Sequence, residues 1–470
     1  MNHIITGTYF LAVLLFIFGL KLLSSPTTAR KGNLIAGVGM LLAILITFPL
    51  IYLQYNQDPN FAKKFGFMVL AILLGSLIGW VSAKKVSITD MPQMVALFNG
   101  MGGGAAWAIG CLEILRGHGD FALKVLAALA LIIGAISFSG SGGAFVKLQG
   151  WIGDRPITFP GQHILNAILL LATFILGFII FWNIAYLDSF NVFLFYLFFI
   201  FFNVLPFILG FLITLPIGGA DMPVVISLFN AMTGLAVAFD GFAIQNYTLI
   251  VSGTIVGASG TLLTFLMAKA MNRSITNILF GAMGKIVGGE AKDRVMKEIS
   301  AEDAAATLAY ANKVIIVPGF GLAAAQSQHK IKELMDELES RGVEVKFAIH
   351  PVAGRMPGHM NVLLAEADIP YDKLYDLEEI NEEFSTADVA LIVGANDVVN
   401  PSAENDPNSP IYGMPILKAY NAKNVFVIKR GRGRGFAGID NELFYLDKTF
   451  MLFGDARDVI SKLVQAIKRF

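Results

Sequence analysis

The chain has 470 residues, of which 55% are hydrophobic and only 15% are charged, and its mean hydropathy is +0.65. Soluble proteins carry about 25% charged residues, so this composition indicates that much of the chain lies in lipid. The formal net charge is zero, which argues against a nucleic-acid-binding surface. The only cysteine is Cys111, which excludes an intramolecular disulfide and any metal site built from several cysteines.

Apolar segments long enough to cross a bilayer occupy the first part of the chain. The first runs from Ile4 to Leu23. It lacks the basic start and the small-residue cleavage site of a signal peptide, so we expect a retained helix. The sequence predicts about nine spans in total, and the other eight are expected at residues 34–53, 66–83, 91–112, 121–145, 164–184, 190–214, 222–243 and 247–270.

Basic residues gather in the loops on one side of these spans, namely Lys21, Arg30, Lys31, Lys84, Lys85, Lys147, Arg155, Lys269 and Arg273. The other side has only Lys63, Lys64, Arg116 and Lys124. By the positive-inside rule, the N-terminus lies outside and the C-terminal domain lies in the cytoplasm, or on the equivalent side of an organelle. We therefore expect a multi-pass protein of the inner (plasma) membrane, surrounded by membrane lipid.

The membrane region contains an internal repeat. Asp90-Met91-Pro92 precedes Leu97-Phe98-Asn99, and Asp221-Met222-Pro223 precedes Leu228-Phe229-Asn230 at the same spacing. The acidic residue and the proline suit a helix start, which places each asparagine about 13 Å deep at ~1.5 Å per residue. An asparagine at that depth is costly without a partner or water, so both are functional candidates; simple hydrogen bonding between helices is the alternative.

Small hydroxylated segments follow each copy of the repeat. They are Ser139-Gly140-Ser141-Gly142 and Gly257-Ala258-Ser259-Gly260. Such residues favour close helix packing, and a hydrated path is the alternative role.

Beyond the last span the chain has the composition of a soluble α/β domain. Residues 272–300 are expected to link a transmembrane domain at 1–271 to a nucleotide-binding domain at 301–470. The alternation of strands and helices predicts a parallel sheet with helices on both faces. The expected fold is thus a multi-pass α-helical membrane domain plus a Rossmann-like α/β domain, with strands near 313–317, 343–349, 389–393 and 424–428 and helices at 322–340, 361–367, 414–421 and from 455.

The stretch from Lys313 to Gln326 joins an apolar strand to a glycine-rich turn and a helix start. Gly319, Gly321 and Ala324 form a G-x-G-x-x-A arrangement, in which glycines let backbone N–H groups approach a pyrophosphate. The pattern alone is weak, because a tight turn without a ligand also produces it. Its place between strand and helix favours a dinucleotide site.

The residues after two other strands indicate which dinucleotide binds. The second strand ends at Ile349-His350, without the acidic residue that holds the ribose hydroxyls of NAD. A later strand ends in Lys429-Arg430-Gly431-Arg432-Gly433-Arg434-Gly435, whose four cations suit a 2′-phosphate. A solvated basic loop beside lipid headgroups is the alternative. We therefore predict an NADP(H) site.

Two further loops contribute polar groups and glycines near the strand ends. Gly354 and Gly358 allow close backbone approach in the segment from His350 to Ala367. Asn396, Asp397 and Asn400 lie just past a strand, where α/β sheets bind ligands. No nucleophile–base pair and no metal constellation is evident, so the cofactor supplies the chemistry.

These motifs resemble the beta subunit of the proton-translocating NAD(P) transhydrogenase over essentially the whole chain. The segments that carry the resemblance are G-F-G-L-A-A-A-Q, H-P-V-A-G-R-M-P-G-H-M-N-V-L-L-A-E-A, G-A-N-D-V-V-N-P, K-R, G-F-A-G and G-A-D-M-P-V-V-I-S-L-F-N. The resemblance implies that an alpha subunit binds NAD(H) and that this chain binds NADP(H). It also implies hydride transfer between the two nicotinamides, proton passage through the membrane helices, and a dimer of alpha–beta units.

The resemblance also implies roles for individual residues. Lys429 and Arg430 hold the 2′-phosphate, and Asp397 is a coupling candidate, which we group with Asn230, Asn99, Asp221 and Ser141. The predicted cofactor-binding set is Gly319, Phe320, Gly321, Leu322, Ala323, Ala324, Val352, Ala353, Gly354, Arg355, Met356, Pro357, Gly394, Ala395, Asn396, Asp397, Lys429, Arg430, Gly431, Gly435, Phe436 and Ala437.

The chain departs from the resembled family at two places. Asn99 stands where many relatives carry a membrane histidine, so a proton step there needs water or a titrating group of the partner subunit. The loop from Gly431 to Arg434 is unusually basic, and Phe436 replaces a usual tyrosine.

Two other functions remain open from the sequence. One is a secondary transporter regulated by a nucleotide-sensing domain, with the repeat as its permeation core. The other is a soluble-type reductase tethered by inert helices, against which the paired intramembrane asparagines argue. Co-purification of an NAD-binding partner distinguishes the transhydrogenase from both.

Overall fold

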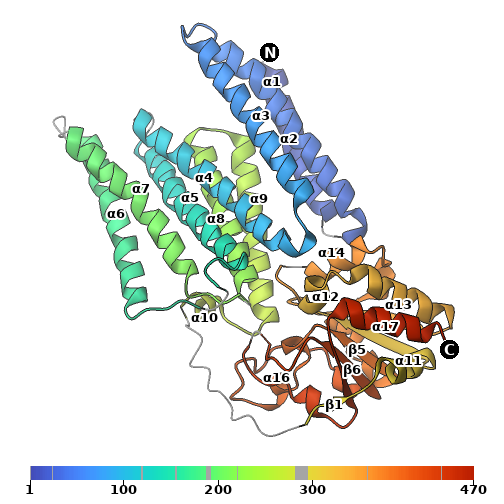
Figure 1. The fold of residues 1–470 in the computed structure, drawn as a ribbon. Helices are drawn as coiled ribbons and strands as arrows, with labels where there is room; N and C mark the ends of the chain where they lie inside the picture. Colours follow the sequence, from blue (N-terminus) through green and yellow to red (C-terminus); the bar gives the residue numbers. More distant parts are fainter. Residues whose placement is uncertain are drawn as a thin grey trace.

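The computed structural model describes residues 2–23, 25–117, 120–153, 156–186, 192–219, 221–280, 295–356, 358–435 and 437–470. Long helices form one part of the molecule, and a mixed α/β part lies at one end of these helices (Figure 1). The predicted fold class is confirmed by this arrangement of a multi-helical part and a parallel sheet.

Within the described residues, nine helices are long and apolar enough to cross a membrane. Each prediction of a span from hydropathy has its helix. The bounds of these helices are α1 Asn2–Leu23, α2 Pro26–Tyr55, α3 Phe61–Lys85, α4 Met91–Arg116, α5 Phe121–Leu148, α6 Gln162–Tyr186, α7 Val192–Thr214, α8 Met222–Ala243 and α9 Tyr247–Ala270. The helices α1 to α6 extend beyond the predicted ranges, α8 and α9 match them, and α7 begins at Val192.

The helices form two groups, α1–α3 and α4–α9 (Figure 1). Close packing in the second group depends on small residues, as is usual for helices in lipid. A side chain at Gly103 of α4 would come within 2.9 Å of the Gly134 carbonyl oxygen of α5. In α3, by contrast, no described residue is buried, although Phe65 packs edge-on against Phe48 of α2.

The two copies of the sequence repeat begin α4 and α8, and both helices start at the end that faces the α/β part (Figure 1). The repeat is therefore parallel rather than inverted. The helices touch at equivalent positions, since a side chain at Gly102 would lie 3.1 Å from Thr233 Cγ2. Asn99 and Asn230 precede these residues by one turn or less, so they lie at the same depth.

The α/β part is built on a parallel seven-stranded sheet with the order β1-β7-β6-β5-β2-β3-β4. The strand order reverses between β2 and β5, which is the point where doubly wound sheets bind ligands. The strands are β1 Lys297–Glu298, β2 Lys313–Pro318, β3 Glu344–Ile349, β4 Leu374–Asp376, β5 Val389–Val393, β6 Asn424–Lys429 and β7 Thr449–Phe453.

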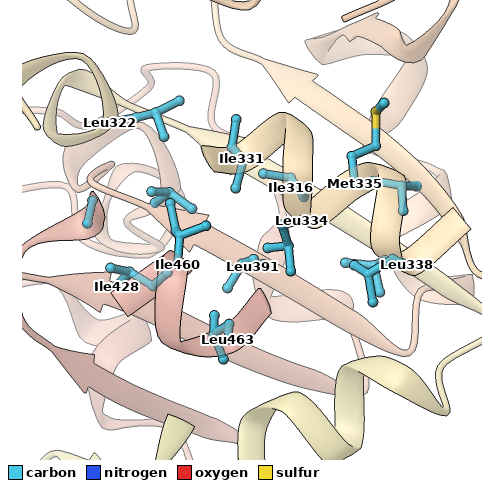
Figure 2. Packing of buried hydrophobic residues seen from close by; sticks show 14 of the residues in the cluster. Ile316, Leu322, Ile331, Leu334, Met335, Leu338, Leu391, Ile428, Ile460 and Leu463 are labelled. Carbon is cyan, nitrogen blue, oxygen red and sulfur yellow. The ribbon is translucent and has the colours of Figure 1, made fainter. Parts of the chain in front are cut away.

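Side chains of the central strands alternate between two hydrophobic cores. Ile316 packs with Leu391 and Ile428 on one face, under the long helices α13 (Gln328–Ser340) and α17 (Ala456–Ile467) (Figure 2). On the same face lie α11 (Ala301–Ala309), α12 (Phe320–Ala324) and α14 (His359–Glu366). The other face is covered mainly by short helices, including α15 (Leu377–Ile380) and α16 (Ser402–Asn405), and by 3₁₀ turns.

Several predicted elements differ from those observed. The expected helix at 414–421 is only a 3₁₀ turn at Ala419–Asn421, because Pro415 disfavours helical backbone at the preceding residue. The expected helix at 322–340 is divided into α12 and α13, since Gln326 adopts a positive φ of 47°. The strands β1, β4 and β7 were not predicted. β1 lies inside the segment expected to be a linker, and the domain boundaries themselves stay a prediction.

Candidate functional site

The glycines of the G-x-G-x-x-A motif pack against the turn that follows β5. The Gly319 N–H donates to the Val393 carbonyl oxygen at 2.9 Å, and the Gly321 N–H donates to that of Gly394 at 3.0 Å. A side chain at Gly321 would lie 2.6 Å from Gly394 Cα, and Gly394 itself has a φ of +67°. These glycines therefore bring two loops together at the switch point, and their N–H groups are already used in doing so.

A cavity of about 800 Å³ lies at this switch point. The turns after β2, β5 and β6 contribute most of its wall, as expected for a doubly wound sheet. Its lining residues are Asp221, Met271, Arg273, Gly319, Phe320, Gly321, Val352, Ala353, Gly354, Gly394, Ala395, Asn396, Asp397, Val398, Asn408, Pro410, Ile411, Met414, Ile428, Lys429, Arg430, Gly431, Gly433, Arg434, Gly435, Ala437, Ile439, Gly454 and Ala456.

The basic loop after β6 gives the cavity its positive charge. Lys429 is partly buried, donates to the Gly433 carbonyl oxygen, and lies 4.8 Å from the ring centroid of Phe444. Burial lowers the pKa of Lys429, while Asp397 and Asp440 oppose this shift. Arg430 lines the cavity without a partner among the described residues. Arg432, in contrast, extends toward Glu298 at 3.6 Å, outside the cavity lining.

This loop is attached to the loop after β5 by three side chains. The Asp397 carboxylate accepts from the Ala437 N–H at 2.9 Å. Asn441 Nδ2 donates to the Asn396 carbonyl oxygen at 2.9 Å, and Asn400 Nδ2 donates to the Asp440 carbonyl oxygen at 3.1 Å. The two loops thus form one wall of the cavity.

His350, just after β3, and His359, the first residue of α14, are structural residues. His350 is buried; its Nδ1 accepts from the Val352 N–H, so its Nε2 donates to the Pro415 carbonyl oxygen at 2.7 Å. His359 Nδ1 accepts from the Arg355 N–H at 3.0 Å. Burial lowers the pKa of each imidazole to about 4. Neither histidine lines the cavity.

The membrane helices close the cavity on one side. Asp221 at the start of α8 is buried and pairs with Arg273, which follows α9, and both residues line the cavity. Two further contacts join the parts: Asn272 Nδ2 donates to the Tyr412 carbonyl oxygen at 3.0 Å, and Arg355 Nη1 donates to that of Leu148 at 3.4 Å. The ends of α8 and α9 therefore contact whatever fills the cavity.

Polar side chains continue from this end into the membrane bundle. Asn99 Nδ2 donates to Ser141 Oγ at 2.8 Å, while the buried Asn99 Oδ1 has no partner among the described residues. One turn further along α5, Ser137 Oγ bonds the Phe229 carbonyl oxygen at 2.9 Å. No hydrogen-bond partner of the Asn230 amide is found in the described part of the chain.

Comparison with known proteins identifies the family. The family model described as "NAD(P) transhydrogenase beta subunit" matches residues 5–466. Two sequences named NAD(P) transhydrogenase subunit beta, both from Rhodospirillum rubrum and one assigned to a named strain, are 48% identical to this chain over 482 residues. These alignments cover 99% of this chain and 100% of each relative.

The chain belongs to the NAD(P) transhydrogenase beta-subunit family. The predicted resemblance is thereby confirmed, and with it a multi-pass membrane protein of an oxidoreductase family that uses nicotinamide nucleotides. Membership as a beta subunit also implies a partner alpha subunit.

Most residues predicted for the transhydrogenase nucleotide site line the cavity of about 800 Å³. Leu322, Ala323 and Ala324 do not line it; the first two are buried in the hydrophobic core. Arg355 and Met356 also lie outside the lining, and the Arg355 guanidinium stacks 4.4 Å from the Phe320 ring centroid. Pro357 and Phe436 lie outside the described residues. That any of these residues binds the nucleotide stays a prediction.

The predicted coupling residues fall into two places. Asp397 and Asp221 line the cavity, whereas Asn99, Ser141 and Asn230 lie within the membrane helices. Sequence reasoning missed part of the lining: Met271, Arg273, Val398, Asn408, Pro410, Ile411, Met414, Ile428, Ile439, Gly454 and Ala456. The polar, proline-containing segment from Asn405 to Pro410 was the one local signal for some of them.

Proposed function

We propose that this chain is the NADP(H)-binding and proton-conducting subunit of a membrane transhydrogenase. Hydride passes directly between NAD(H) on the alpha subunit and NADP(H) on this chain, coupled to proton translocation. The observation that carries the proposal is a nucleotide-sized cavity at the switch point that is lined by both the basic β6 loop and the ends of α8 and α9.

The residues present fit NADP(H). Gly319, Gly321 and Gly394 let the turns after β2 and β5 pack backbone against backbone, and all three line the cavity, so no side chain of theirs stands between these turns and a dinucleotide. Lys429 and Arg430 supply two cations at the end of β6, as a 2′-phosphate requires. The nucleotide supplies the hydride chemistry, and the protein supplies binding and orientation.

Coupling is supported by the position of Asp221 and Arg273. This ion pair joins the start of α8 to the end of α9 and faces the cavity. A change in the nucleotide that occupies the cavity therefore acts directly on both helices. In our proposal, Asp397 relays that change, because it lines the cavity and holds the β6 loop through Ala437. Asn99, Ser141 and Asn230 then order the proton path. The nucleotide domain lies on the cytoplasmic side of the inner membrane, and the N-terminus lies outside.

The test is reconstitution of this chain with its alpha subunit in sealed vesicles. Reduction of an NAD analogue by NADPH should acidify one side of the membrane, and an uncoupler should abolish the gradient while leaving turnover intact. A nucleotide-regulated secondary transporter would show solute flux without hydride exchange. That result would overturn the proposed function in favour of the transporter.

A further inference from the structure

A buried carboxylate lies at the other end of α8 from Asp221. Asp240 is only 1% exposed, and both of its carboxylate oxygens lack a hydrogen-bond partner among the described residues. An ionised carboxylate buried among apolar helices is costly unless it is paired, so Asp240 needs a proton or a transient partner. Asp240 takes no part in the ion pair between Asp221 and Arg273, because it lies at the other end of α8, near the opposite membrane face.

Among the residues that the structure describes, no cation is paired with Asp240. Cys111 and Glu113 of α4 lie close enough to interact electrostatically with the carboxylate. Glu113 is already paired with Arg116 at 2.5 Å. From the other helices that pack on α8, the titratable groups at this end are Lys124 of α5, with Asp120 just before that helix, and the exposed Tyr247 of α9. None of these forms an ion pair with Asp240 in the described part of the chain.

Asp240 continues the polar stripe that contains Asn230. At 3.6 residues per turn, Asn230, Thr233, Val237 and Asp240 lie on one side of α8. This side faces α4 and α5, since Thr233 Oγ1 lies 2.6 Å from Ser137 Oγ of α5 and Thr233 Cγ2 lies beside Gly102 of α4. The stripe spans about 15 Å from Asn230 to Asp240. The stripe therefore runs from the level of Asn99 and Asn230 in the membrane to the membrane face opposite the nucleotide domain.

We propose that Asp240 is the proton-binding group at this outer end of the path, an inference that rests on the proposed function. One carboxylate oxygen takes a proton from the outer aqueous side and becomes a neutral acid within the bundle. Transfer of this proton to a water molecule beside Thr233 and Asn230 breaks the new O–H bond and restores the carboxylate, and the hydronium ion so formed carries the proton onward. Asp240 thus supplies a titratable group to a stripe whose other polar members, Asn230 and Thr233, do not titrate near neutral pH.

The experiment compares Asp240→Asn, Asp240→Glu and the wild type in the complete alpha–beta complex in vesicles. Asp240→Asn should lower proton pumping and the coupled reaction about a hundredfold, as for loss of a proton-transfer group. Hydride exchange that bypasses the proton step should remain within about twofold, because the nucleotide site is distant. Asp240→Glu should retain pumping. An infrared band of a protonated carboxylic acid should be present in the wild type and absent in Asp240→Asn.

Asp58→Asn is the matched control, because Asp58 lies in a loop at the same membrane face and pairs with Lys64 at 2.6 Å. It should pump like the wild type. Normal pumping by Asp240→Asn would overturn the inference and leave the proposed function intact. Equal loss of pumping and bypass exchange in both Asp240 variants would also overturn it, since Asp240 would then be structural. A wild-type complex without hydride exchange would remove the proposed function, and this inference with it.

Discussion

The Asp397 carboxylate accepts a hydrogen bond from the Ala437 N–H at 2.9 Å. Together with the contacts of Asn441 and Asn400, this hydrogen bond connects the turn after β5 with the basic loop after β6. Gly435 lies so close to Asp397 that any side chain there would collide with the carboxylate. The loop that carries the cavity's cations is thus held by an acidic residue of the same cavity. Release of this loop from Asp397 and release of the nucleotide should therefore be linked.

We expect Asp397→Ala to free the β6 loop and accelerate NADP(H) dissociation. Loss of a hydrogen bond to a charged acceptor corresponds to roughly 1.5–3 kcal/mol, or about ten- to a hundredfold in rate. Stopped-flow fluorescence of bound NADPH measures it. Asp440→Ala is the control, because Asp440 lies on the same loop but pairs with the exposed Arg434 at 2.9 Å. Equal NADP(H) dissociation rates for the wild type and Asp397→Ala would show that the Asp397–Ala437 hydrogen bond does not retain the nucleotide.

Lys429→Ala and Arg430→Ala should each weaken NADP(H) binding while leaving weak NAD(H) binding nearly unchanged. Each lost charge-assisted contact with a 2′-phosphate is worth roughly 1.5–3 kcal/mol. Calorimetry on the fragment from about Ala291 to Phe470, which we expect to fold alone, provides both affinities.

Arg432→Ala removes the same charge from the same loop but outside the cavity lining, so it should bind NADP(H) like the wild type. Equal affinity of the unmodified fragment for NADP(H) and NAD(H) would exclude the assigned 2′-phosphate site.

Asn230→Leu should fold but impair coupling, because the Asn230 amide has no partner among the described residues and can order water at the depth of Asn99. Pumping in vesicles should fall, while hydride exchange that bypasses the proton step survives. Asn166→Leu of α6 is a matched control, since it makes the same change in a helix that packs mainly against α7. If Asn230→Leu pumps at the normal ratio to turnover, Asn230 only holds helices together.

The stability of the α/β part should fall in acid because of His350. Burial lowers its folded-state pKa to about 4, below the value of 6.5 for an unperturbed histidine. The unfolded chain therefore takes up a proton first, so this contribution is complete above pH 6.5 and is lost as the pH falls toward 4. A shift of this size corresponds to roughly 3 kcal/mol.

Thermal melting at several pH values tests this, and His350→Gln should flatten the decline between neutral and weakly acidic pH. His359 contributes in the same direction, because burial also lowers its pKa to about 4. His329→Gln is the control, since His329 is exposed on α13, and it should leave the profile unchanged. An unaltered acid profile in His350→Gln would show that other groups dominate.

Hydropathy and local patterns were enough for the membrane spans and for β2, whose run from Val314 to Val317 is fully buried. They failed where one residue overrides its neighbours, as at Pro415 and Gln326. The cavity was predicted from motifs that follow strands. The contribution of Asp221 and Arg273 was not, because it depends on how α8 and α9 meet the sheet, and no local pattern encodes that contact.

Because the membrane helices form part of the cavity wall, nucleotide affinity reports how these helices interact with the bound nucleotide. An isolated α/β fragment lacks Asp221, Met271 and Arg273, whereas the whole chain supplies them. RT times the logarithm of the ratio of the two dissociation constants is therefore the free energy with which the membrane helices favour or oppose the bound nucleotide. By thermodynamic reciprocity, the nucleotide biases the α8–α9 helix ends by the same amount. Two titrations would thus set an upper limit on the work that each binding event can deliver to proton movement.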